Sequence, residues 1–419
     1  MKILFVSEYY PPKTMGGGEI NLEVLATALT KRGVEVSVLT SYFPGLEETE
    51  MKKGLTILRN LKTGNNPSSV IENIKRSLFF SQSIVREVKN ILNKQEIDAI
   101  HFIGTSIIAA NALKNLRVPL FATIESYPAL CPKGDRIFRG KKECKRECSF
   151  ANFLSCQASS RDIGKMKNEW YLKYNFPVLS YIYHYYSQLH KSLPQCNLIA
   201  ISEYVQRLLK QQGNDSIVIP NALPINKFKV DKEKKSKYPK IIYFGSLIRS
   251  KGPQVLLEAI EGLNVKCELY GEGVLQKELE QKIQQRKLSA KIFAPVPYDE
   301  IPSLYAQADI VVFPSVWPEP FGRIAIEAMA AGKPVVGSAI GGIKETITKE
   351  TGILVEPGNS QQLREAIMML IHNPTLRKTM EKTGRGIAEK NYTEDKVVER
   401  LIAVYKTKIN SSFSNLNRP

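Results

Sequence analysis

The chain has 419 residues, of which 43% are apolar and 24% are charged, so it is long enough for two globular domains and too apolar for general disorder. Its net charge of +18 favours anionic partners, such as phosphorylated ligands or an anionic membrane surface. No nucleic-acid-binding motif accompanies that charge, and no apolar run approaches the roughly 20 residues that span a bilayer. We therefore expect neither a nucleic-acid-binding nor a membrane-spanning protein.

The first segment predicts a buried parallel strand, because residues 3–6 form a continuous apolar run. That run is too short for the apolar part of a signal peptide, so we expect a cytoplasmic protein. Three glycines at 16–18, a helical pattern over 20–32 and a strand over 34–39 follow. This order is typical of the start of a Rossmann-like unit. Further strands are predicted at 98–102, 120–124 and 198–201.

The pattern breaks down between residues 131 and 190, where a cysteine-rich basic loop precedes an aromatic stretch. It restarts with a strand that ends at Gly245. After this strand, the sequence predicts helices at 253–261 and 322–331 and strands at 266–270, 310–313 and 334–337. We therefore expect an α/β fold with two Rossmann-like domains, residues 1–220 and 221–393, and a last helix over 394–410 that packs back on the first domain.

Two glutamates eight residues apart, Glu319 and Glu327, are the main candidates for chemistry. Glu319 lies in a loop between two prolines, and Gly322 opens a predicted helix that carries Glu327. The free N–H groups of a helix N-terminus suit phosphate or sugar oxygens, and a carboxylate in that helix can bind the two hydroxyls of a ribose. Two glutamates at this spacing are more often surface charges than a functional pair. The flanking residues therefore decide between these two interpretations.

Those flanking residues resemble glycosyltransferase family 4, which comprises retaining enzymes with two Rossmann-like domains facing across a cleft, the GT-B architecture. The resemblance extends over nearly the whole chain. Its anchors besides the glutamate motif are short segments in one order: Gly16-Gly17 with Glu19, Ile219-Pro220-Asn221, Phe244-Gly245, Lys251-Gly252, Gly271-Glu272-Gly273, residues 331–336, Gly341-Gly342 with Glu345, and residues 351–355.

The resemblance implies a metal-independent hexosyltransferase that needs no cofactor for catalysis. It would move a sugar from a nucleotide diphosphate sugar to a saccharide or lipid-linked acceptor in cell-surface polysaccharide or glycolipid synthesis. Glu319 would contact the transferred sugar, Glu327 would bind the donor ribose, and Lys251 would stabilise the leaving diphosphate. The other donor-binding positions that the resemblance implies are Gly16, Gly17, Gly245, Phe321 and Gly322.

The sequence departs from the family pattern at two places. An arginine often follows the glycine at position 245, but here the nearest one is Arg249, which we predict to assist Lys251 in catalysis. The family often has Thr-x-His-Asp after a strand of the first domain, and here Glu125 replaces the histidine. Either Glu125 acts on the acceptor or the site is shifted. His101, at a strand end, is a second candidate for contact with the acceptor, and a purely structural role is equally compatible with its position.

A second group of residues lies in the basic loop. Four cysteines, Cys131, Cys144, Cys148 and Cys156, can form a structural zinc site, although the spacings match no standard template, and reduced structural thiols are the alternative. Between residues 133 and 167 the chain has ten Lys or Arg residues against four Asp or Glu, and aromatic residues follow. This composition indicates either contact with the anionic inner face of the cell membrane or a lipid-linked acceptor, or a solvated loop beside a packed helix.

Other functions stay open from the sequence. Nucleotide-sugar epimerases and phosphorylases share the architecture, but epimerases usually lack the proline-framed glutamate motif, and phosphorylases are far longer. A non-catalytic nucleotide-sugar binding protein also fits, because the family histidine is absent at position 125.

Overall fold

The computed structural model describes residues 1–14, 16–63, 70–139, 142–144, 148–159, 175–228 and 238–416. The chain forms two compact units. Unit 1 comprises Met1–Gly134, Ser180–Leu223 and Glu394–Pro419, and unit 2 comprises Asp135–Leu179 and Pro224–Thr393. These units differ from the predicted domains 1–220 and 221–393 in residues 135–179, which group with unit 2. This insertion adds no strand to the sheet of unit 1 and, in its described part, folds into elements of its own.

Unit 1 is built on an eight-stranded sheet with the order β10-β9-β6-β5-β1-β2-β4-β3. Neighbouring strands are parallel except for the antiparallel pair β3 and β4. The strands are β1 (Lys2–Ser7), β2 (Glu35–Ser41), β3 (Thr49–Lys52), β4 (Leu55–Leu61), β5 (Ala99–Ile103), β6 (Leu120–Ile124), β9 (Asn197–Ala200) and β10 (Ser216–Val218). The central strands are apolar throughout because helices cover both faces of such a sheet.

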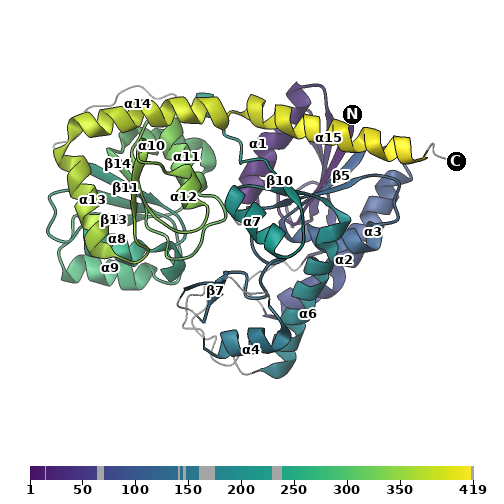
Figure 1. Cartoon of the computed structure of the whole chain (residues 1–419), viewed down its shortest axis with the longest axis horizontal. Helices are drawn as coiled ribbons and strands as arrows, with labels where there is room; N and C mark the ends of the chain where they lie inside the picture. The colour runs from purple at the N-terminus through teal and green to yellow at the C-terminus, as the bar shows by residue number, and fades with distance from the viewer. Residues whose placement is uncertain are drawn as a thin grey trace. The chain divides into compact units, whose positions relative to one another are not determined.

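The helices of unit 1 include the chain's last one, α15 (Glu394–Leu416), which packs against α1 (Gly17–Lys31), as Figure 1 shows. Its apolar residues Val397, Leu401 and Tyr405 belong to the same buried core as β1. The other α-helices are α2 (Val70–Leu92), α3 (Ala110–Leu113), α7 (Glu203–Gln211) and α6 (Phe176–Ser192), whose first turn belongs to unit 2.

Unit 2 contains a six-stranded, wholly parallel sheet with the order β13-β12-β11-β14-β15-β16. Its strands are β11 (Lys240–Phe244), β12 (Lys266–Tyr270), β13 (Ala290–Phe293), β14 (Ile310–Phe313), β15 (Val335–Ser338) and β16 (Gly352–Val355). The strand order reverses between β11 and β14. In such sheets ligands bind outside the carboxyl ends of the strands at this switch point.

The helices of unit 2 are α8 (Pro253–Ala259), α9 (Gln276–Gln285), α10 (Ile301–Gln307), α11 (Arg323–Ala330), α12 (Ile343–Thr346), α13 (Ser360–His372) and α14 (Pro374–Asn391). The insertion contributes the two-stranded sheet of β7 (Ile137–Phe138) and β8 (Lys142–Glu143), and helix α4 (Phe150–Ala158). The predicted fold class, α/β with two Rossmann-like domains, is confirmed. In the described parts of the chain, no helix combines the length and the apolar character needed to cross a bilayer.

Candidate functional site

The loop after β14 is held from one side by the turn that carries Lys251. The Val316 N–H donates a hydrogen bond of 2.9 Å to the carbonyl oxygen of Ser250. A Cβ added to Gly252, which has a φ of +75°, would overlap the carbonyl oxygen of Pro314. Only glycine permits this close approach of two backbones, and the approach fixes Lys251 relative to the loop.

A second glycine turn holds the same loop at Glu319. The Gly342 N–H donates a hydrogen bond of 2.7 Å to the carbonyl oxygen of Glu319. A Cβ on Gly341, where φ is +59°, would overlap that same oxygen. The loop that carries Glu319 is therefore held at two places by turns that follow different strands, β11 and β15.

The Glu319 carboxylate is the centre of a polar cluster at the switch point of the sheet. Its Oε1 accepts three hydrogen bonds of 2.7 Å, from Lys251 Nζ, Ser315 Oγ and Trp317 Nε1. The Lys251 ammonium also lies over the Trp317 ring, 4.7 Å from its centroid. The Glu319 side chain is 8% exposed and that of Lys251 is 24% exposed. The structure thus brings two predicted residues together and adds Ser315 and Trp317.

Glu327 lies on α11 and is held at both carboxylate oxygens. Its Oε1 accepts from Arg323 Nε at 2.8 Å, and its Oε2 accepts from the Tyr305 hydroxyl at 3.2 Å. Arg323 also donates to the Tyr298 hydroxyl at 2.8 Å. Burial, together with the nearby Glu327 carboxylate, raises the pKa of Tyr305 well above its usual value, so this phenol stays a hydrogen-bond donor. The carboxylate is buried and oriented before any ligand arrives.

Three other predicted donor residues belong to the same unit. Gly245 follows β11 with a φ of +148°, and Gly322 precedes α11 with a φ of +107°, so both positions favour glycine. The Phe321 ring is buried edge-on against Tyr392, at a centroid distance of 5.9 Å. Its side chain therefore supports the loop from the core.

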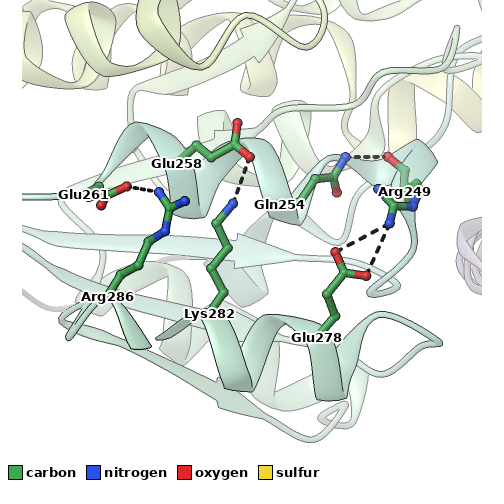
Figure 2. A network of polar contacts seen from close by, with 7 residues as sticks. All are labelled: Arg249, Gln254, Glu258, Glu261, Glu278, Lys282 and Arg286. Atoms are coloured by element: carbon green, nitrogen blue, oxygen red, sulfur yellow. Dashed lines mark hydrogen bonds and ion pairs between the residues drawn. The ribbon is translucent and has the colours of Figure 1, made fainter. Parts of the chain in front are cut away.

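Arg249 is placed differently from the prediction. Its guanidinium pairs with Glu278 of α9 at 3.3 Å, and both side chains are more than half exposed. Figure 2 shows this pair within a surface network of α8 and α9 that also includes Gln254. Within residues 238–416, Arg249 makes no side-chain contact with the Glu319 cluster. A role beside Lys251 would require the exposed pair to open, and it stays a prediction.

On unit 1, Glu125 follows β6 and lies against the start of α1. Asn21 donates to Glu125 Oε1 at 3.2 Å and accepts from the Ala222 N–H at 2.9 Å. A Cβ on Gly18 would overlap the Glu125 carboxylate, whereas one on Gly16 would meet open space. The close approach in the glycine loop therefore occurs at Gly18. A small hollow adjoins Glu125; its lining is Gly104, Thr105, Ile124, Glu125, Ser126, Pro128, Ala129 and Leu189.

For His101 the structure supports the structural alternative rather than contact with the acceptor. The side chain is fully buried, with Nδ1 2.5 Å from the Tyr405 hydroxyl and Nε2 2.7 Å from the Thr123 hydroxyl. Burial lowers the pKa of His101 to about 3, so the ring is neutral at physiological pH. His101 is a core residue that joins β5 to β6 and α15.

The cysteines do not form an assembled metal site in the structure. Among the described residues, which include the four predicted ligands, no three His, Cys, Asp or Glu side chains are grouped to hold a metal ion. The Cys156 thiol instead contacts the Ile137 carbonyl oxygen at 3.7 Å and the Arg139 N–H at 3.3 Å. Zinc binding stays a prediction. Much of the basic loop, including residues 145–147 and 160–174, lies outside the described residues.

Comparison with known families tests the resemblance directly. A family described as Glycosyltransferase Family 4 matches residues 15–227, and one described as Glycosyl transferases group 1 matches residues 224–387. The chain belongs to glycosyltransferase family 4. The resemblance inferred from the motifs is therefore confirmed, and the protein is a glycosyltransferase.

Individual relatives of this family 4 glycosyltransferase agree with that assignment. An uncharacterized glycosyltransferase of Methanocaldococcus jannaschii is 26% identical over 97% of this chain and 98% of its own. The capsular polysaccharide biosynthesis glycosyltransferase CapM of Staphylococcus aureus is 27% identical over 46% of this chain and 54% of its own. Anabaena HepE, solved in complex with UDP-glucose, has a TM-score of 0.66 with 22% identity, over 97% of this chain and 100% of that one. The last likeness shows a shared GT-B fold.

Proposed function

We propose that this family 4 enzyme moves a hexose from a nucleotide diphosphate sugar to a saccharide or lipid-linked acceptor, with retention of anomeric configuration. The observation that carries the proposal is the convergence of Lys251, Ser315 and Trp317 on the buried Glu319 carboxylate at the switch point of the unit 2 sheet. The complex of HepE with UDP-glucose supports a nucleotide-sugar donor. The name of CapM supports a role in polysaccharide synthesis, and glycolipid synthesis is the companion proposal.

The chemistry follows from charge. As the bond between the sugar and the diphosphate breaks, negative charge grows on the leaving diphosphate, and the Lys251 ammonium stabilises that charge. Glu327 binds the ribose hydroxyls, and Glu319 binds hydroxyls of the transferred sugar. The acceptor attacks on the face that the diphosphate leaves, which retains the configuration. No metal ion or other cofactor is proposed for this step.

The acceptor side is proposed to lie at the Glu125 hollow on unit 1. This hollow lies at the carboxyl ends of β5 and β6, where α/β sheets bind ligands, and its lining combines polar groups with apolar walls. Glu125 is proposed to accept a hydrogen bond from an acceptor hydroxyl, and Asn21 orients its carboxylate.

A thermal-shift screen with UDP-, GDP- and ADP-sugars tests the donor proposal, because ligand binding stabilises the folded protein. The expected result is a rise in melting temperature with one of the three, followed by release of its nucleoside diphosphate in the presence of saccharide or lipid-linked acceptors. Glu319→Gln should bind the same donor but release little. Absence of any shift with all three sugars would contradict the proposal.

Glu125 in place of the family histidine favours one second candidate, a nucleotide-sugar binding protein without catalysis. Donor binding without any release of nucleoside diphosphate, across a panel of acceptors, would favour that candidate. Conversion of the donor into a different nucleotide sugar without an acceptor would indicate an epimerase.

The enzyme is also proposed to be cytoplasmic and peripheral on the inner face of the cell membrane. The net charge of +18 supports attraction to an anionic leaflet. Helix α2 adds two neighbouring exposed apolar side chains, Leu78 and Phe79, which are 54% and 56% exposed.

A further inference from the structure

Lys251 is engaged by two neighbouring side chains of its own unit. Its ammonium is 2.7 Å from Glu319 Oε1 and lies over the Trp317 ring at 4.7 Å. The proposed function requires the same ammonium to face the donor diphosphate. It must then give up at least part of its pairing with Glu319.

That change has a cost for Glu319. A carboxylate that is only 8% exposed is unfavourable without its cation, unless other donors bond to it. Two neutral donors, the Ser315 hydroxyl and the Trp317 indole N–H, remain on the same Oε1 atom. Within residues 238–416 no hydrogen bond reaches Oε2, so that oxygen can accept from a sugar hydroxyl.

We propose that Trp317 is a positioning residue that acts through Lys251 and Glu319. Its ring face holds the Lys251 ammonium beside Glu319. Its indole N–H keeps Glu319 hydrogen-bonded when the ammonium turns to the diphosphate. This inference rests on the proposed function, since it concerns the same donor site.

Tryptophan is the side chain that combines both properties. It offers the strongest cation-binding ring face among the aromatic residues and an N–H that can only donate. The loop that carries Trp317 is fixed by the Ser250 and Gly342 backbone contacts, so the indole is placed without rearrangement. Phenylalanine at this position would keep a ring face and lose the donor.

The test compares two nucleotides that differ only in the terminal phosphate. The probes are UDP, GDP and ADP, of which the tightest binder is used, together with the corresponding nucleoside monophosphate. A free nucleoside diphosphate carries more negative charge than the ester in the donor, so it reports strongly on Lys251. In the wild type, the diphosphate should bind more tightly than the monophosphate.

Trp317→Phe should lower the affinity for the diphosphate about tenfold, which is the size of one hydrogen bond to a charged group, and leave the affinity for the monophosphate unchanged. Ser315→Ala, the matched variant, should act in the same direction because it removes the other neutral donor. In a Lys251→Met background, Trp317→Phe should have no further effect, since no ammonium is left to release. An equal loss for both nucleotides, or a full effect in the Lys251→Met background, would assign Trp317 a structural role only.

Fluorescence gives a second readout that needs no change at Trp317. The chain has two tryptophans, and Trp170→Phe leaves Trp317 as the only one. The nucleoside diphosphate should change the emission of this variant much more than the monophosphate, and addition of Lys251→Met should abolish the difference. If the diphosphate binds but neither readout changes, the role of Trp317 is wrong and the donor site stands. If no nucleoside diphosphate binds, the proposed function fails as well.

Discussion

Glu327 is oriented by its neighbours before any ligand arrives. Arg323 and Tyr305 bond to its two oxygens, so a ribose would meet a carboxylate that loses little freedom on binding. We expect Glu327→Ala to weaken donor binding roughly ten- to a hundredfold, because hydrogen bonds to a charged group are lost. Calorimetry with the donor found in the screen measures the effect. Glu365→Ala, which removes an exposed glutamate of α13, is the control, and an equal dissociation constant for both variants would contradict the role.

His101 makes a prediction about pH. Its pKa is about 3 in the folded protein and near 6.5 in the unfolded chain, so below pH 6.5 the unfolded chain binds a proton that the folded protein does not. This contribution to stability is present above pH 6.5 and is lost as the pH falls towards 3. Between pH 7 and pH 5 the free energy of unfolding of the wild type should fall by about 2 kcal/mol more than that of His101→Asn, as measured by urea unfolding. Equal losses would show that His101 titrates normally.

The sequence predicted some site residues and missed others for a physical reason. Glu319, Glu327 and Lys251 stand in short local motifs, which a linear pattern can show. Trp317 and Ser315 also lie in such a motif, but their shared contact with Glu319 Oε1 depends on how the loop folds. The role of His101 could not be predicted, since its partner Tyr405 lies 304 positions away in the sequence.

At the scale of elements, two glycines with similar backbones offer a matched comparison. Gly252 and Gly262 have φ values of +75° and +71°, but only Gly252 lies against another backbone, at Pro314. Gly262→Ala should cost about 1–3 kcal/mol of unfolding free energy from the strained backbone alone. Gly252→Ala should cost clearly more and should also weaken nucleoside diphosphate binding, because Lys251 is the preceding residue. Equal effects on urea unfolding would show that the loop moves aside easily.

The cysteine-rich insertion carries the four residues of the predicted zinc site. A zinc site of four sulfurs requires about one equivalent of zinc per chain, and this zinc should be lost in the double variant Cys144→Ser, Cys148→Ser. Elemental mass spectrometry after metal-replete purification without chelators measures it. Less than about a tenth of an equivalent would reject zinc and leave hydrogen-bonded thiols, as Cys156 already shows.

Most strands of both sheets follow from continuous apolar runs, which is why the parallel cores were predictable. The pair β3 and β4 was not predicted, because Thr49–Lys52 is short and mostly exposed at the sheet edge. A polar edge strand has no apolar run to mark it.

For the whole molecule, charge and exposed apolar surface predict a membrane contact. The wild type should sediment with vesicles that contain about a third anionic lipid and should dissociate at high salt, because screening weakens the attraction. Leu78→Ser with Phe79→Ser should reduce the bound fraction severalfold. Met369→Ser, which changes an exposed apolar side chain of α13, is the control. Binding that depends neither on salt nor on these residues would contradict the proposal.

The division into two units also limits how well domain boundaries can be predicted from the sequence alone. The two sheets are separate in sequence, so two domains were predictable. The chain, however, passes from one unit to the other at residues 134, 179, 223 and 393, and the first two passages are marked by no linker composition. The predicted boundary at residue 220 therefore placed residues 135–179 with the first domain.

Helix α15 has a consequence for synthesis on the ribosome. The core of unit 1 includes Val397, Leu401 and Tyr405, which are translated long after the strands that they cover. A nascent chain that ends before Glu394 holds all residues of unit 2 but leaves β1 and β5 of unit 1 uncovered and His101 without its tyrosine. Unit 1 can therefore complete its core only after all residues of unit 2 have been translated.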